Sequence, residues 1–138
     1  MVGFSMPNEI VLLTSDAEAP HLGSILQRHN PSLKIIHARD QEELMDICLG
    51  DGTDARRLIA FCTSVIVSTE ILDLVMFPAY NFHPGPPTYP GSYVANFAIY
   101  DGADMFGATV HEMTAKVDSG PIVGVEWFEV AEGLRFTD

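Results

Sequence analysis

Short apolar runs separated by amphipathic segments mark the first part of the chain. Four of these runs, Glu9–Leu13, Leu33–His37, Arg57–Cys62 and Ala79–His83, are rich in branched or aromatic residues. Polar or turn-forming residues follow each run closely. Runs of this length and composition are typical of buried β-strands. The pattern therefore predicts four strands before residue 84.

The segments between these strands have the spacing of amphipathic helices. In Pro20–His29 the apolar side chains share one face, and a proline suits the first turn of a helix. Asp40 can cap a second helix that ends at Leu49, with Glu43 three residues later as in a capping box. The other predicted elements are a short helix capped by Ser68 or Thr69 and ending at Val75, a helix capped by Ser92 and ended by Gly102, and strands over Gly107–Met113 and Pro121–Val130.

Strands that alternate with helices along a chain indicate an α/β fold with a mostly parallel sheet. The last two predicted strands are joined by a short turn at Val117–Gly120, so we expect this pair to be antiparallel and the sheet to be mixed. A chain of 138 residues suits one domain, 1–138, with residues 1–7 as a loose arm in front of it.

The composition is that of a globular domain with a core, since 47% of the residues are hydrophobic and 19% are charged. No apolar stretch approaches the roughly 20 residues that a membrane helix needs, and Met1–Pro7 lacks the features of a signal peptide. Cys48 and Cys62 form no Cys-x-x-Cys motif and are expected to be reduced, partly buried thiols. We therefore expect a cytoplasmic protein without a membrane partner.

The net charge is strongly negative, because 19 acidic residues face seven basic ones, which gives −12. Such a chain repels polyanions, so nucleic acid is not expected as a partner. A local basic patch in the N-terminal half stays open, although solvated surface charge is the simpler interpretation. The basic residues of that half are Arg28, Lys34, Arg39, Arg56 and Arg57.

The segment Asn81–Gly91 carries the clearest chemical signal, with four prolines and two glycines after His83. Asn81 and His83 alternate at the end of a predicted strand, so both side chains should point to one side. Ligands of open α/β sheets bind beyond the carboxyl ends of the strands. Pro84 favours an extended backbone at His83, and the prolines stiffen the loop, as a reacting centre requires. Hydrogen bonding within the loop is the alternative role for both side chains.

A second pair of motifs follows, Gly107–His111 (GATVH) and Val117–Ile122 (VDSGPI). By itself an aspartate before Ser-Gly-Pro is a turn residue, so Asp118 gains interest only in combination with Asn81 and His83. His111 is a second candidate acid or base, although a histidine in a strand more often serves only as a hydrogen-bonding residue.

The order Asn-x-His-Pro-Gly, a proline loop ending in Tyr-Pro-Gly, GATVH and DSGPI resembles the formyltransferase family, most strongly over Leu58–Val130. That family includes glycinamide ribonucleotide, methionyl-tRNA and sugar N-formyltransferases. Each motif is weak alone, but their ordered combination is specific. The resemblance implies a three-layer, Rossmann-like α/β fold whose mostly parallel sheet has a late antiparallel strand. It also implies that Asn81, His83 and Asp118 are catalytic.

The reaction that the resemblance implies is transfer of a formyl group from 10-formyltetrahydrofolate to a primary amine of a small acceptor, such as an amino sugar. Asn81 would donate to the oxyanion of the tetrahedral intermediate. His83 would donate to it as imidazolium or shuttle the proton, while Asp118 orients the imidazole or holds a relay water. This chemistry requires neither a metal nor a covalent enzyme intermediate.

The resemblance further implies that the folate lies against the segment Phe61–Ile66 after the third predicted strand and the loop Thr114–Asp118 after the fifth. Core packing is an equally good interpretation for the apolar members of this set. The predicted folate contacts are Phe61, Cys62, Val65, Ile66, Thr114 and Val117.

Three departures from the family pattern leave alternatives open. The loop Gly85–Gly91 lacks the leucine that relatives carry before the second proline, and Thr14–Pro20 has two acids where purine-pathway relatives have a glycine-rich phosphate cradle. The abrupt end at Asp138 suggests truncation, completion by a homodimer or a small acceptor. The competing hypotheses are an inactive relative that binds folate or an amine, and a hydrolase that releases formate from 10-formyltetrahydrofolate.

Overall fold

The computed structural model describes residues 6–50, 55–90, 93–114 and 120–131. Every strand and helix predicted from the sequence is present, and β5 begins two residues earlier than expected. The elements are β1 (Glu9–Leu13), α1 (Ala19–His29), β2 (Lys34–Ala38), α2 (Gln41–Leu49), β3 (Arg56–Phe61), α3 (Thr69–Leu74), β4 (Tyr80–His83), α4 (Val94–Tyr100), β5 (Met105–Glu112) and β6 (Ile122–Glu129).

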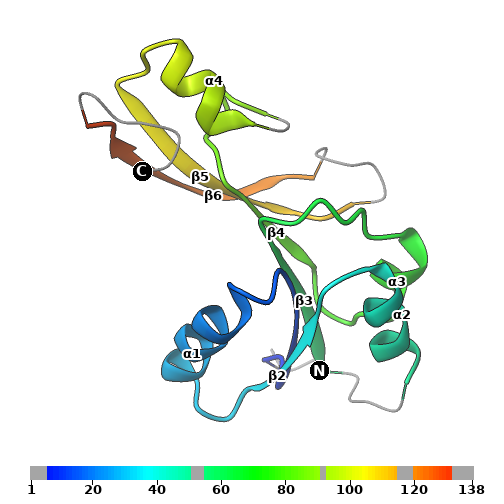
Figure 1. The fold of residues 1–138 in the computed structure, drawn as a ribbon. Coiled ribbons are helices and arrows are strands. Elements are labelled where there is room, and N and C mark those ends of the chain that lie inside the picture. Colours follow the sequence, from blue (N-terminus) through cyan, green and yellow to red (C-terminus); the bar gives the residue numbers. More distant parts are fainter. Residues whose placement is uncertain (1–5, 51–54, 91–92, 115–119, 132–138) are drawn as a thin grey trace.

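A six-stranded sheet with the order β2-β1-β3-β4-β5-β6 organises the fold (Figure 1). Strands β1 to β4 are parallel, whereas β5 is antiparallel to both of its neighbours. The direction of β6 therefore matches that of the first four strands. The prediction of a mostly parallel sheet with a late antiparallel strand is confirmed.

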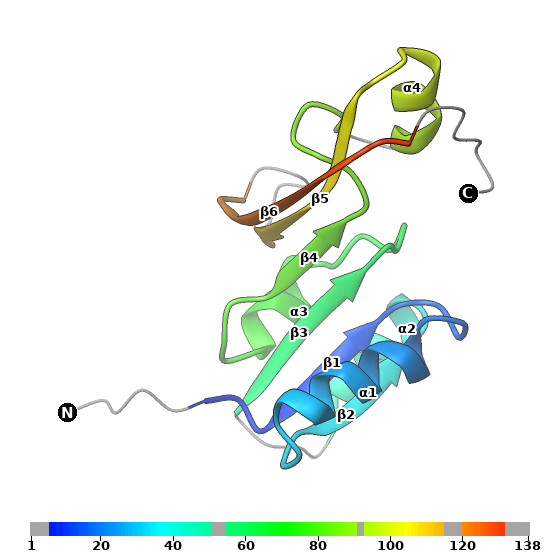
Figure 2. The same cartoon turned by 90° about the vertical axis from the view of Figure 1, so that its left-hand side faces the viewer.

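Helices lie on both faces of the N-terminal half of the sheet. Helix α1 covers one face, and α2 and α3 cover the other, as Figures 1 and 2 show from two sides. Strand β1 lies between two neighbours, and all five of its residues are buried, which explains its uniformly apolar sequence. The main core fills the space between the sheet and α2 and α3, and its fully buried side chains include Val11, Leu13, Leu44, Leu58 and Ile71.

Local capping fixes the ends of several helices. The Asp40 carboxylate accepts from the Glu43 N–H at 2.9 Å, and the Ser68 hydroxyl accepts from the Ile71 N–H, as predicted. The Glu43 carboxylate accepts from the Arg39 N–H, one residue before the position expected for a capping box.

Helix α4 has no side-chain hydrogen bond from the residue at its N-terminal cap, Tyr93, whose backbone is left-handed with φ 56°. The predicted cap, Ser92, lies outside the described residues. The helix ends at Tyr100, and Gly102 follows with φ 68°, a conformation that favours glycine and supports the predicted end of this helix.

An ion pair is buried at the amino ends of β1 and β3. Glu9 and Arg56 are register partners, and their side chains are 2% and 6% exposed. Arg56 Nη2 lies 3.3 Å from Glu9 Oε1, and Nη1 donates to the Ile47 carbonyl at 3.1 Å. The interpretation of Arg56 as solvated surface charge is therefore wrong, because its guanidinium is used inside the protein.

Candidate active site

Strand β4 delivers Asn81 and His83 to the carboxyl edge of the sheet, as the alternation predicted. Asn81 lies opposite Ala60 of β3 and His111 of β5, and His83 lies opposite Thr109. Both side chains line a cavity of about 220 Å³. The other residues around this cavity are Cys62, Thr63, Ser64, Phe82, Pro84, Tyr93 and Val94.

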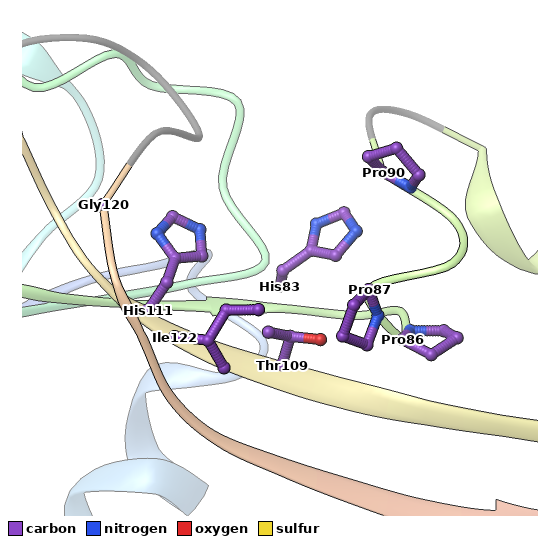
Figure 3. Close-up of a pocket in the computed structure, with 8 residues that line it drawn as sticks. All are labelled: His83, Pro86, Pro87, Pro90, Thr109, His111, Gly120 and Ile122. Carbon is purple, nitrogen blue, oxygen red and sulfur yellow. The ribbon is translucent and has the colours of Figure 1, made fainter.

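A second cavity, of about 140 Å³, lies beside the proline loop. Figure 3 shows the His83 and His111 side chains rising from neighbouring strands, with the prolines on the far side of His83. The lining residues are His83, Pro86, Pro87, Pro90, Thr109, His111, Gly120 and Ile122. Among the described residues, His83 is the one side chain that both cavities share. This position suits a group that exchanges a proton between two substrates.

The loop after β4 holds the His83 ring. His83 Nε2 lies 3.1 Å from the Tyr89 carbonyl oxygen, which can only accept, so Nε2 carries the proton of a neutral ring. Nδ1 is then the nitrogen that can take up a proton. Tyr89 is fixed in turn, since its N–H donates to Pro86 and its hydroxyl donates to Asp101 at 3.0 Å. This hydrogen bond to Asp101 raises the pKa of Tyr89.

Strand β5 anchors the same loop through a contact that the sequence analysis missed. The Thr109 hydroxyl donates to the Gly85 carbonyl at 2.7 Å, and Thr109 is buried. Thr109 and His111 are two residues apart in a strand, so they share a face. Because His111 was already a candidate residue, this two-residue spacing within GATVH could have indicated that Thr109 also faces the site.

Gly85 is needed because no side chain fits at its position. A Cβ there would lie 2.8 Å from Val94 Cγ2 and 3.1 Å from His83 Nε2. We expect Gly85→Ala to lose about 1–3 kcal/mol of stability by overpacking. Displacement of the imidazole by about 1 Å should lower kcat by about 10²-fold. Urea unfolding and steady-state kinetics measure the two effects.

The double variant Gly85→Ala/Val94→Ala is the matched control for this prediction. It removes the 2.8 Å contact with Val94 Cγ2 but leaves the 3.1 Å contacts with the Cβ of residue 94 and with His83 Nε2. Stability should therefore recover more than kcat does. A single Gly85→Ala variant with the kcat of the parent protein would contradict the proposed constraint on the imidazole.

Asn81 and His111 form a hydrogen bond across the two strands, with 3.2 Å between Asn81 Nδ2 and His111 Nε2. His111 Nδ1 lies 3.4 Å from the Glu112 carbonyl oxygen. The interpretation of His111 as a hydrogen-bonded strand histidine is confirmed by these contacts.

The structure brings only part of the predicted folate contacts to the cavities. Cys62 is exposed, not partly buried as expected, and lines the larger cavity. Partial desolvation of its thiol, with a smaller effect of the Glu18 charge, raises the pKa of Cys62. Phe61 packs near the Phe82 ring at 6.1 Å, and Val65 packs partly on the core. Ile66 and Thr114 are exposed, and Val117 and Asp118 lie outside the described residues.

The sequence matches the model of the family described as Formyl transferase over residues 8–136. The chain therefore belongs to the formyl transferase family. It is 36% identical over 76 residues to a methionyl-tRNA formyltransferase of Pseudothermotoga lettingae, a match that covers 51% of this chain and 25% of that protein. It is 31% identical over 126 residues to formyltetrahydrofolate deformylase 2, mitochondrial, of Arabidopsis thaliana, covering 86% of this chain and 37% of that protein.

Solved structures share this fold. HypX from Aquifex aeolicus in complex with tetrahydrofolic acid superposes with a TM-score of 0.73 and 18% identity, over 92% of this chain and 22% of that one. The chain spans 25% of the matched methionyl-tRNA formyltransferase and 37% of the matched deformylase.

In the parts of the chain that the structure describes, no helix is both long and apolar enough to cross a membrane. No group of three His, Cys, Asp or Glu side chains within those parts is placed to bind a metal ion.

Proposed function

We propose that this chain transfers a formyl group from 10-formyltetrahydrofolate to a primary amine of a small acceptor, such as an amino sugar. The observation that carries the proposal is that Asn81 and His83 line one cavity at the carboxyl edge of the sheet, in a member of the formyl transferase family. The solved HypX complex holds tetrahydrofolic acid on a related fold, which supports a folate donor.

In the proposed reaction the amine nitrogen attacks the formyl carbon, and the bond from that carbon to N10 of the folate then breaks. The amine loses a proton and N10 gains one, so His83 between the two cavities is suited to move it. The Asn81 amide N–H donates to the oxygen that becomes negative. Asp118 is proposed to orient the imidazole or to hold a relay water.

The folate is proposed to contact both the segment after β3 and the loop after β5. Cys62, which lines the larger cavity, is the contact that the geometry supports best. The remaining proposed contacts are Phe61, Val65, Ile66, Thr114 and Val117.

The acceptor is proposed to bind without a large phosphate site. The loop after β1 carries Asp16, whose carboxylate is 71% exposed and pairs with Arg39. Asp16 also lies 3.8 Å from His37 Nδ1. Phosphorylated amines in the acceptor panel test this proposal, and we expect them to be poorer acceptors than amino sugars because the exposed Asp16 carboxylate repels a phosphate.

We further propose a cytoplasmic protein of one domain that forms a homodimer. The edge strand β6 supports the dimer, because large apolar side chains are exposed along it and burial of such a surface favours association. These side chains are Ile122, Val123, Trp127 and Phe128, which are 46–56% exposed.

Hydrolysis of 10-formyltetrahydrofolate is the second candidate function. The deformylase of Arabidopsis thaliana matches 126 residues, a longer stretch than the methionyl-tRNA formyltransferase match of 76 residues. The same oxyanion donor and proton shuttle serve attack by water on the formyl carbon. The two candidates differ only in the nucleophile that occupies the site.

The decisive experiment incubates the protein with 10-formyltetrahydrofolate, with and without a panel of amines, and measures tetrahydrofolate and formate. Formyl transfer predicts tetrahydrofolate that depends on an amine, with a formylated amine as the second product. Hydrolysis predicts equal amounts of tetrahydrofolate and formate without any amine. Binding of folate without either product would contradict both candidates and favour an inactive relative. Asp118→Asn should lose turnover while the fold survives.

A further inference from the structure

We propose that His111 is a positioning residue that sets the orientation of the Asn81 amide. This inference rests on the proposed formyl transfer, in which Asn81 donates to the oxyanion. Its basis is the 3.2 Å contact between Asn81 Nδ2 and His111 Nε2. The two residues are also direct partners in the β4–β5 ladder, so the backbone itself holds them together.

The contact indicates which ring nitrogen of His111 accepts a hydrogen bond. An amide nitrogen carries hydrogens and no acceptor site, so His111 Nε2 must accept and the ring proton must lie on Nδ1. His111 Nδ1 lies 3.4 Å from the Glu112 carbonyl oxygen, which can only accept. Both contacts fit a ring in which Nε2 accepts and Nδ1 donates.

An accepting Nε2 holds the nitrogen end of the Asn81 amide towards His111, as the structure shows. One hydrogen of Nδ2 is held by the imidazole, and the second hydrogen remains in the amide plane for the oxyanion. Without an acceptor at position 111, the amide could rotate and present its carbonyl oxygen to the substrate. A carbonyl oxygen would repel the developing negative charge instead of stabilising it.

A local irregularity in β6 lies opposite His111, whereas the ladder between β4 and β5 is regular through this residue. The register between β5 and β6 shifts between Val110 and His111. Irregularities of this kind re-aim a side chain and occur often beside active sites. The regular pairing with Asn81 holds His111 in place, and His111 lines the 140 Å³ cavity together with His83, so it lies within the site and not in the core.

The test compares His111→Leu with His111→Gln in the full chain. Leucine removes the acceptor, whereas a glutamine carbonyl can replace Nε2. We expect His111→Leu to lower kcat by more than about 10-fold, towards the roughly 10²–10³-fold that loss of an oxyanion donor costs. KM should change little, and His111→Gln should recover most of kcat. Thermal unfolding checks that both variants fold.

A double-mutant cycle separates positioning from direct catalysis. If His111 acts through Asn81, adding His111→Leu to Asn81→Ala should lower kcat by less than about threefold further, because residues that act as a unit are not additive. Full multiplication of the two losses would overturn the proposal. So would a folded His111→Leu variant with unchanged kcat.

Failure of the proposed function gives a different result. In that case the parent protein forms neither formylated amine nor formate. The orientation of the amide can still be tested by nitrogen NMR of the imidazole, where an unprotonated Nε2 that accepts a hydrogen bond is expected in the parent protein. The side-chain amide signal of Asn81 should then move in His111→Leu and return in His111→Gln. A protonated Nε2 would overturn the inference even without activity.

Discussion

Replacement of His83 with alanine is expected to lower kcat for the proposed formyl transfer by about 10²–10⁴-fold, the usual contribution of a positioned acid or base. The physical reason is that His83 lines both cavities and has one ring nitrogen committed to Tyr89, which leaves the other for proton transfer. Tetrahydrofolate release under saturating donor and acceptor measures the effect.

His29→Ala is the matched control, because His29 is an exposed histidine in the last turn of α1. It should keep the parent kcat and a similar unfolding midpoint. If His83→Ala were folded and retained full turnover, the site would be assigned wrongly and a different group would have to move the proton.

Replacement of Glu9 with alanine is expected to lower the free energy of unfolding by about 3–5 kcal/mol, because it leaves the buried Arg56 guanidinium without its charge partner. The effect is large because both side chains are nearly inaccessible to water. Urea denaturation monitored by circular dichroism measures the change in the midpoint.

The double variant Glu9→Leu/Arg56→Leu is the informative comparison for this pair. Removing both charges together avoids the unpaired ion, so replacement by apolar groups is often neutral or stabilising by about 1–4 kcal/mol. It should therefore be more stable than Glu9→Ala. A Glu9→Ala protein as stable as the parent would show that water reaches the guanidinium.

Sequence patterns sufficed for the architecture and for the positions of Asn81 and His83. Both predictions depend on local periodicity: apolar runs such as Glu9–Leu13 identify strands, and residues two apart in a strand share a face. The rigid loop after His83 was also predictable, because its prolines restrict the backbone wherever the chain places them.

Contacts between distant parts of the chain were not predictable in this way. The Glu9–Arg56 pair joins residues 47 positions apart, and the Thr109–Gly85 hydrogen bond joins residues 24 apart. Each depends on strand order and register, which no local pattern specifies. The folate contacts were hard to predict for a different reason: binding through backbone groups leaves little trace in side-chain identity.

Because β5 runs antiparallel to β4, the site can keep its geometry when the sequence of the surrounding segments changes. Because Asn81 and His83 face His111 and Thr109 as rungs of one antiparallel ladder, four side chains of the site are attached to paired backbone. Their amide hydrogens should exchange slowly with solvent, while those of the surrounding connections exchange faster. The chemical framework can thus persist while the segments around it diverge, which is one way for related chains to accept different nucleophiles.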